Sequence, residues 1–325
     1  MADSQTKVLC ILRFPVHILE QYRSGISDAL PEVAVTMVAT PEDAFPHLAD
    51  TDVLVTFGPM LGEHAPEIFK QATSLKWIQA MGTGVDNITD IQTLDDKVVV
   101  TNMHGIHGAP VSEAAISLML AMSRDLPLYS RQQLDGIWNR PRAPALLEGK
   151  IAGIFGIGSI AESLAPRLGA LGMKVVGISS AVRSIEGFDS VIHRDQLMDI
   201  VGDLDHLVLL TPLTDATRNI IGRKVLAAMK STAFLINLAR GGVVDEAALI
   251  AALKKGQIAG AALDVFAIEP LPSEHPLWGM ENVMITPHTG GFNDAYPRLA
   301  LPTLIENMRR FLAGERKNFK NLVPR

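Results

Sequence analysis

Short apolar runs alternate with helical stretches along almost the whole chain. Runs rich in Val, Ile and Leu predict strands in the first hundred residues at 7–12, 33–38, 52–57, 76–81 and 98–102, and later at 151–158, 174–180, 206–212, 233–239, 260–266 and 283–288. Such near-continuous runs are typical of strands buried on both faces of a parallel sheet. Because helical segments lie between them, the pattern predicts βαβ units and doubly wound sheets.

The chain is expected to divide near Asn102–Gly108, where glycine interrupts the strand pattern. A long apolar helix then follows, with Ser112 as its expected N-cap. The last helical segment, Asp294–Gly314, contains Pro297 and Pro302, which are expected to divide it into pieces. We expect this segment to return to the first domain.

With 325 residues the chain is longer than one typical core requires. The pattern therefore predicts two α/β domains with doubly wound parallel sheets and a cleft between them. Residues 1–103 plus 292–325 are expected to form a flavodoxin-like substrate domain. Residues 104–291 are expected to form a Rossmann domain that binds NAD(P).

A glycine-rich turn, GIGSIA at 156–161, follows a predicted strand and opens a predicted helix. Gly156 allows the tight turn, and Gly158 lets the backbone approach a pyrophosphate. The amides at the helix start, at Ser159 and Ile160, can then bind phosphate. Taken alone, this turn occurs in many α/β proteins; its strand–turn–helix context favours a dinucleotide site.

The next predicted strand indicates which dinucleotide binds. In NAD enzymes this strand ends in an acidic residue that holds the adenosine ribose. Here Ser179 and Ser180 stand at that position, and Arg183 follows. Hydroxyls and a guanidinium can bind a 2′-phosphate, so we predict NADP(H) over NAD(H). The alternative is that Arg183 is a solvated loop residue and the enzyme accepts both cofactors.

Three chemically suited residues follow three later strands: Arg240, Glu269 and His288. A guanidinium can bind a carboxylate through two hydrogen bonds and polarise an adjacent ketone. A carboxylate bonded to an imidazole orients the ring and favours its protonated form, which makes proton donation to a carbonyl feasible. Each of these residues alone could equally be structural or solvated.

A resemblance to a known family extends over essentially the whole chain. The motifs that show it are INLARGGVVDEAALIAALKKGQIAGAALDVFAIEPLP, ENVMITPHTGG and MGTGVDNI at 81–88. The chain resembles the D-isomer-specific 2-hydroxyacid dehydrogenase family, most closely its glyoxylate/hydroxypyruvate reductase type. The resemblance implies that Arg240 anchors the substrate, that Glu269 is the partner of His288, and that His288 donates the proton.

The resemblance also implies roles for residues outside this set of three. The substrate would bind Arg240, His288 and the backbone of Met81, Gly82, Thr83 and Gly84. Beyond the residues of the turn and the serine pair, the cofactor would lie along Thr211, Pro212, Leu238, Ala239, Asp264 and Gly290, with Asp264 on the nicotinamide carboxamide. Family members are typically homodimers, and the arm Leu126–Pro144 with Trp138 is similar to their dimer segment.

Departures from related enzymes narrow the predicted substrate. Family members acting on phosphoglycerate carry an arginine just before the GTG stretch, where this chain has Ala80. Without that cation a phosphorylated substrate lacks its counter-charge. Formate dehydrogenases of the superfamily have glutamine where Glu269 stands, which argues against that reaction.

Charge and composition exclude several other function classes. The net charge of −6 argues against a nucleic-acid or anionic-membrane surface. The single cysteine, Cys10, fits a reducing cytoplasm and is expected to be a buried structural thiol.

The polar segment Met1–Thr6 does not have the pattern of a signal peptide, so we expect a cytoplasmic protein without a membrane span. His104 and His107 lack a convincing third ligand, and we predict no metal.

These observations predict an NADP-dependent reductase of small, non-phosphorylated 2-oxoacids, such as glyoxylate and hydroxypyruvate, that yields D-2-hydroxyacids. One alternative is a reductase of bulkier 2-oxoacids such as phenylpyruvate. The other belongs to a different class, a non-catalytic, nucleotide-sensing dimeric binding protein. Activity on a panel of 2-oxoacids distinguishes the three.

Overall fold

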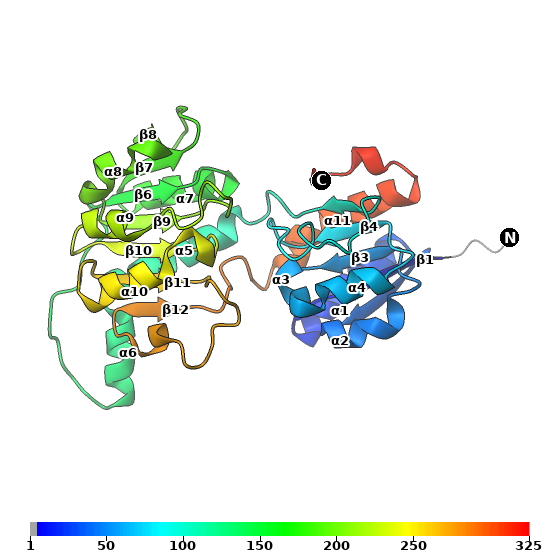
Figure 1. Cartoon of the computed structure of the whole chain (residues 1–325), viewed down its shortest axis with the longest axis horizontal. Coiled ribbons are helices and arrows are strands. Elements are labelled where there is room, and N and C mark those ends of the chain that lie inside the picture. Colours follow the sequence, from blue (N-terminus) through cyan, green and yellow to red (C-terminus); the bar gives the residue numbers. More distant parts are fainter. Residues whose placement is uncertain (1–4, 325) are drawn as a thin grey trace. The chain divides into compact units, whose positions relative to one another are not determined.

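The computed structural model describes residues 5–324, so most of the polar segment Met1–Thr6 lies outside the described residues. The chain forms two compact units, each with its own sheet (Figure 1). The first contains the described residues up to Ile106 and those from Asn293 onward, and the second is His107–Phe292. None of the described helices is both long and apolar enough to cross a bilayer.

The first unit is built on a parallel sheet with the strand order β2-β1-β3-β4-β5. Its strands are β1 (Thr6–Ile11), β2 (Val33–Val38), β3 (Val53–Thr56), β4 (Trp77–Ala80) and β5 (Val99–Thr101). The order reverses between β1 and β3, as in flavodoxin-like folds. Its α-helices are α1 (Val16–Ala29), α2 (Pro41–Ala44), α3 (Gly58–Leu61), α4 (Ala65–Gln71) and α11 (Tyr296–Leu312).

Both faces of this first sheet are covered, which explains the continuous apolar runs of its strands. On β1, Val8 and Cys10 pack in one apolar cluster, while Leu9 and Ile11 pack in a second cluster on the opposite face. The helix α1 buries residues at intervals of four, and α11 packs against it. Burial raises the pKa of the Cys10 thiol to about 12, so this cysteine is an unreactive core residue.

The second unit is built on a parallel sheet with the order β12-β11-β10-β9-β6-β7-β8. Its strands are β6 (Ile151–Phe155), β7 (Lys174–Ser179), β8 (Ser190–His193), β9 (His206–Leu209), β10 (Phe234–Asn237), β11 (Gly260–Leu263) and β12 (Val283–Ile285). Its α-helices are α5 (Gly108–Ser123), α6 (Leu126–Leu134), α7 (Ser159–Ala170), α8 (Leu197–Ile200), α9 (Arg223–Ala228) and α10 (Glu246–Lys254). The order reverses between β6 and β9, the arrangement of a Rossmann fold. The prediction of two doubly wound parallel sheets is confirmed.

Two expectations about helices are wrong. The helix α5 begins at Gly108, and Ser112 lies inside it, where its hydroxyl donates to the Gly108 carbonyl at 2.6 Å. The sequence Gly-Ala-Pro can form a first turn because the amides there need no partner within the helix. The helix α11 is undivided: Pro297 occupies its first turn, and the helix continues past Pro302 with buried residues on either side of that proline.

Candidate active site

The glycine-rich turn joins β6 to α7 at the point where the strand order reverses. Gly156 has a φ of 100°, and a Cβ there would lie 2.6 Å from backbone atoms of Thr211. Glycine is therefore required both by the left-handed backbone and by the close approach of the segment that follows β9. A Cβ on Gly158 would meet no described atom within 4 Å, so this turn has room for a ligand against its backbone.

The segment after β7 holds the residues predicted to select the cofactor. The strand ends at Ser179, whose hydroxyl accepts a hydrogen bond from the Ala181 amide at 3.3 Å. The guanidinium of Arg183 donates to Oε1 of Glu162 at 2.9 Å, and both side chains are about half exposed. Glu162 lies in the first turn of α7, so the ion pair holds Arg183 beside the helix that begins at the glycine-rich turn.

Arg240 is presented by a turn that the preceding strand determines. The side chain of Asn237, which is buried at the end of β10, accepts from the Ala239 amide and donates to the Arg240 carbonyl, both at 3.1 Å. The Arg240 guanidinium donates to the Ala239 carbonyl at 2.8 Å. Leu238 and Ala239, two predicted cofactor residues, therefore form the same turn as Arg240.

The turn at Arg240 packs tightly against the segment that leaves β11. A Cβ on Gly241 would lie 1.9 Å from the carbonyl carbon of Phe266 and 2.3 Å from the Ala267 nitrogen. No side chain fits at that distance, so glycine is required here by backbone contact. This contact fixes the Arg240 turn relative to the segment that carries Glu269.

Asp264 holds the loop that carries His288. Its carboxylate is buried and accepts from the Thr286 hydroxyl at 2.6 Å and from the Thr289 and Gly290 amides at 2.8 Å each. The Asp264 carbonyl accepts from the His288 amide, also at 2.8 Å. His288 has a φ of 53°, a conformation that non-glycine residues adopt only when the surroundings impose it.

Glu269 and His288 form a close pair. Oε2 of Glu269 lies 2.7 Å from Nδ1 of His288, and Oε1 accepts from the Phe266 amide at 2.9 Å. Burial by itself would raise the pKa of Glu269, but the hydrogen bond and the charge of His288 act against burial, and this pKa lies below its usual value. The Phe266 amide and the charge of Arg240 act in the same direction, so Glu269 is ionised at neutral pH.

These contacts place the three predicted residues at one edge of the second sheet. Arg240, Glu269 and His288 follow β10, β11 and β12, which are adjacent parallel strands. The carboxyl ends of adjacent parallel strands meet at the same edge, where ligands bind in open α/β sheets. With Nδ1 of His288 held by Glu269, Nε2 is the ring nitrogen that can face a substrate.

The predicted loop Met81–Gly84 belongs to the first unit and follows β4 directly. The Met81 carbonyl accepts from the Tyr296 hydroxyl, the Gly82 carbonyl accepts from the Met103 amide at 3.0 Å, and the Thr83 carbonyl accepts from the Asn102 side chain at 2.8 Å. The backbone of this loop is therefore fixed within its own unit.

His104 and His107 have different surroundings. His104 is exposed, whereas His107 is buried and precedes α5. A Cβ added to Gly291 would lie 3.1 Å from the His107 ring, so this ring packs against the loop that follows His288. Among the described residues no group of three or more His, Cys, Asp or Glu side chains could hold a metal ion.

The family model of the NAD-binding domain of D-isomer specific 2-hydroxyacid dehydrogenases matches residues 116–290, more than half of the chain. The chain belongs to this family. The 2-hydroxyacid dehydrogenases of this family are oxidoreductases, and the glycine-rich turn, Arg240, Glu269 and His288 all lie within the matched residues.

The relatives of this chain are named for different substrates. The chain is 36% identical to D-3-phosphoglycerate dehydrogenase of Methanocaldococcus jannaschii over 89% of its own length, but it spans only 55% of that relative. A crystal structure of a D-isomer specific 2-hydroxyacid dehydrogenase from Xanthobacter autotrophicus, in complex with NADPH, is 31% identical, with a TM-score of 0.79 and coverage of 99% of this chain and 98% of the other. An NADPH-dependent glyoxylate/hydroxypyruvate reductase of Sinorhizobium meliloti, with NADP, is 28% identical, with a TM-score of 0.80 and coverage of 98% of both chains.

Some residues that shape the candidate site were not predicted from the sequence. Glu246, at the start of α10, lies 3.1 Å from Nε2 of His275, and its other oxygen accepts from the Ala267 amide at 3.5 Å. These two contacts tie both ends of the loop that carries Glu269. The Asp264 bonds to the His288 loop were also not predicted, because an Asp at the end of a strand gives no sign of which later loop it will hold.

Proposed function

We propose that the chain is an NADP-dependent reductase that converts small, non-phosphorylated 2-oxoacids of the glyoxylate and hydroxypyruvate type to D-2-hydroxyacids. The observation that carries this proposal is the Glu269–His288 pair, 2.7 Å apart, in the segments that follow β11 and β12, the next two strands after the one that presents Arg240. An ionised carboxylate, an imidazole and a guanidinium at one sheet edge suit the binding and protonation of a carbonyl beside a carboxylate.

The residues of the second unit fit a dinucleotide. The open space at Gly158, the start of α7 and the nearby Thr211 and Pro212 lie where the strand order reverses. In this proposal Ser159 and Ile160 offer amides to the pyrophosphate. When bound, the reduced nicotinamide supplies the hydride. Asp264 is committed to the His288 loop in this structure, so its predicted contact with the carboxamide would be made alongside those bonds.

The chain's own residues then account for the remaining chemistry. The Arg240 guanidinium binds the carboxylate of the 2-oxoacid and polarises its ketone. Nε2 of His288 gives its proton to the carbonyl oxygen as the keto carbon is reduced, and Glu269 holds the ring and balances its charge. The binding of substrate by the backbone of Met81–Gly84 stays a prediction. The product is a 2-hydroxyacid, and the imidazole regains its proton from water.

The experiment that tests this function follows the absorbance of reduced cofactor with purified protein. NADPH and NADH are each combined with glyoxylate, hydroxypyruvate, pyruvate, phenylpyruvate, 2-oxoglutarate and 3-phosphohydroxypyruvate. The proposal expects fastest NADPH oxidation with glyoxylate or hydroxypyruvate. Preference for phenylpyruvate or for the phosphorylated acid would overturn the substrate assignment, and no activity with any acid would favour a nucleotide-sensing protein.

One feature of the first unit supports the exclusion of phosphorylated substrates. Ala80 ends β4 and is buried, so no cation stands immediately before the Met81–Gly84 loop. A phosphate group would also require two or more donors to compensate its lost hydration. The Methanocaldococcus relative is named for a phosphorylated substrate, which makes 3-phosphohydroxypyruvate the most informative competitor in the panel.

The preference for NADP rests on the end of β7. Ser179 and Ser180 carry no negative charge, and the Glu162 ion pair holds Arg183 beside α7. The two solved relatives described above contain NADPH or NADP, which agrees with this preference. A guanidinium and two hydroxyls would together bind a 2′-phosphate.

Changing Ser179 to Asp is expected to reverse the preference. The new carboxylate would repel the 2′-phosphate of NADPH and accept hydrogen bonds from the ribose hydroxyls of NADH. We expect kcat/KM with NADPH to fall at least about tenfold, since one lost charge-assisted contact contributes on the order of 1.5–3 kcal/mol. Steady-state kinetics with both cofactors measures the change. Ser190→Asp, at an exposed position of β8, is the matched control; an equal loss there would contradict the assignment.

We also propose a homodimer formed through the arm that includes α6. Several large apolar side chains are exposed along it: Trp138 at 94%, Leu134 at 88% and Ile137 at 53%. Several large exposed apolar side chains within one short segment suggest an interface. Sedimentation should therefore give about twice the chain mass of 35.1 kDa, and Trp138→Ser should shift the protein toward the single chain. A monomeric wild type would contradict the proposal of a homodimer.

The cytoplasmic location of the protein remains a prediction.

A further inference from the structure

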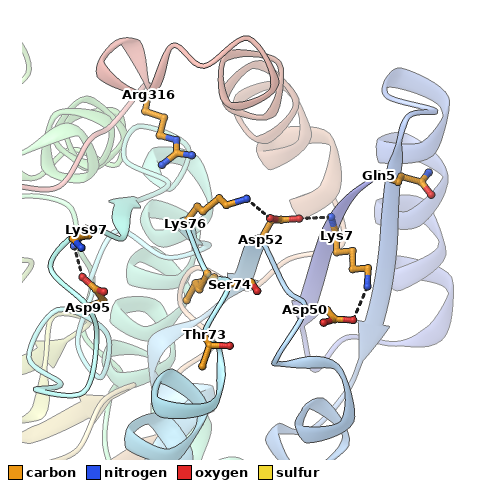
Figure 2. A pocket seen from close by; sticks show the side chains of 11 residues that line it. Gln5, Lys7, Asp50, Asp52, Thr73, Ser74, Lys76, Asp95, Lys97 and Arg316 are labelled. Atoms are coloured by element: carbon orange, nitrogen blue, oxygen red, sulfur yellow. Dashed lines mark hydrogen bonds and ion pairs between the residues drawn. The ribbon is translucent and has the colours of Figure 1, made fainter. Parts of the chain in front are cut away.

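The first unit has a hollow of about 600 Å³ at the edge of its sheet where the strands begin (Figure 2). Lys7 lies on β1, Asp52 precedes β3, and Lys76 precedes β4. The loop Met81–Gly84 follows the carboxyl end of β4, so the hollow and this loop lie at opposite edges of the same sheet. Ligands of doubly wound sheets normally bind at the carboxyl edge, and the hollow is therefore not part of the proposed active site.

Two ion pairs build the floor of the hollow. Lys7 Nζ lies 2.7 Å from Asp50, and Lys76 Nζ lies 2.6 Å from Asp52 (Figure 2). Asp52 also accepts a hydrogen bond from the Lys7 amide at 3.0 Å. Asp52 therefore connects the beginnings of two strands, through the Lys7 backbone and the Lys76 side chain, while Asp50 holds the Lys7 side chain. The charges of these four residues cancel within the floor.

Two further cationic side chains line the hollow, and the four residues of the floor do not neutralise them. Lys97 and Arg316 line the hollow, and neither side chain forms an ion pair with any residue of the described chain. The Arg316 guanidinium lies 5.1 Å from the centre of the Phe311 ring, which restrains its position. Asp95 is the remaining carboxylate, so four cations face three carboxylates and the lining has a net charge of +1 in a chain whose net charge is −6.

The lining also offers many neutral and acidic hydrogen-bonding groups. The hydroxyls of Thr73 and Ser74 border the hollow. Among the described residues that line it, only Leu75 is apolar. Such a surface suits a ligand with several hydroxyl groups, because carboxylates and hydroxyls can accept from them. A volume of about 600 Å³ falls in the range of small-molecule sites.

We propose that this hollow binds a phosphate ester of a polyhydroxylated small molecule, of the sugar-phosphate class. The phosphate would be bound by Lys97 and Arg316, which can form charge-assisted hydrogen bonds with it. The hydroxyl groups would lie along the floor and contact Thr73, Ser74 and Asp50. This site would be separate from the oxoacid site and would bind its ligand without any cofactor.

The test is isothermal titration of the full-length protein with D-glucose 6-phosphate, D-glucose and inorganic phosphate, at low and high salt. We expect D-glucose 6-phosphate to bind more tightly than either fragment and to weaken with salt. Lys97→Ala and Arg316→Gln should each weaken it by about tenfold, the effect of one lost charge-assisted contact. Thermal unfolding of each variant identifies any loss of the folded state, and Lys97, which is exposed, can be replaced without touching the core.

Lys317→Ala is the matched control, because it removes the same charge from an exposed neighbour of Arg316 that does not line the hollow. If Lys317→Ala weakens binding as much as Lys97→Ala does, the binding is a diffuse surface effect and the proposed site is wrong. Binding of inorganic phosphate as tightly as the ester would overturn the sugar-phosphate class. Because these titrations contain no oxoacid or nicotinamide cofactor, their outcome is independent of the proposed reductase activity.

Discussion

Replacing His288 with alanine is expected to lower the turnover of 2-oxoacid reduction by about 10²–10⁴-fold, the usual contribution of a general acid. Glu269 holds Nδ1 of the ring at 2.7 Å, so Nε2 is the group available to protonate the substrate. NADPH affinity should change little. His288 follows β12, whereas the glycine-rich turn that would bind the pyrophosphate follows β6. These two strands are four positions apart in the sheet, about 19 Å at the usual strand spacing, so the substitution should not disturb the turn.

Two measurements separate this catalytic role from a structural one. Turnover at saturating substrate should fall steeply, while the dissociation constant of NADPH, followed by fluorescence, stays within a few-fold of the wild type. His17→Ala, at an exposed position of α1, removes a histidine without touching the site and should leave both quantities unchanged. If NADPH affinity falls in parallel with turnover, His288 supports the fold of the cofactor site and the assigned role is wrong.

Much of the fold could be predicted because strands buried in a parallel sheet have recognisable apolar runs in the sequence. A strand such as Val53–Thr56 is buried along its whole length, so its apolar run is continuous and its bounds are clear. The strand β8, Ser190–His193, was missed because it lies at the edge of its sheet, is only partly buried and contains Ser and His. Edge strands need not repeat the apolar pattern of central strands.

Helix boundaries were predicted less well because tertiary packing decides them. Pro302 removes one backbone hydrogen bond from α11, yet the helix continues because Ala300 and Leu304, on either side of it, are packed into the core of the first unit. The cost of one missing bond is smaller than the gain from burying that face. Neither the local sequence nor helix propensity reveals such a compensation.

The candidate site shows the same division between local and tertiary information. The segments that bear Arg240, Glu269 and His288 could be recognised because each follows a clear strand, and parallel strands bring their carboxyl ends together. The contacts that orient these side chains come from distant parts of the chain. Asp264 holds the His288 loop, and Gly241 packs against the backbone of Phe266. The residues that bear the chemistry were therefore predictable, whereas their supports required the structure.

Replacing Arg240 with alanine is expected to lower kcat/KM for glyoxylate by about 10³-fold. A bidentate contact with the substrate carboxylate contributes on the order of 1.5–3 kcal/mol per charge-assisted hydrogen bond, and the same guanidinium would stabilise the developing negative charge on the carbonyl oxygen. Arg240→Lys keeps the charge but cannot form the planar two-point contact, so it should recover only part of the loss. Arg223→Ala, at the exposed start of α9, is the control for loss of a surface cation.

Binding of oxamate, a carboxylate that cannot be reduced in this reaction, distinguishes anchoring from other roles of Arg240. In the presence of NADPH, oxamate should bind the alanine variant much more weakly, and added guanidinium ion should restore part of the activity. Arg240 also contributes to the lowered pKa of Glu269, so its loss should raise that pKa slightly. Because the His288 contact and the Phe266 amide still lower this pKa, Glu269 should remain ionised at neutral pH. Wild-type affinity for oxamate in the alanine variant would show that Arg240 acts on the Glu269–His288 pair and does not anchor the substrate.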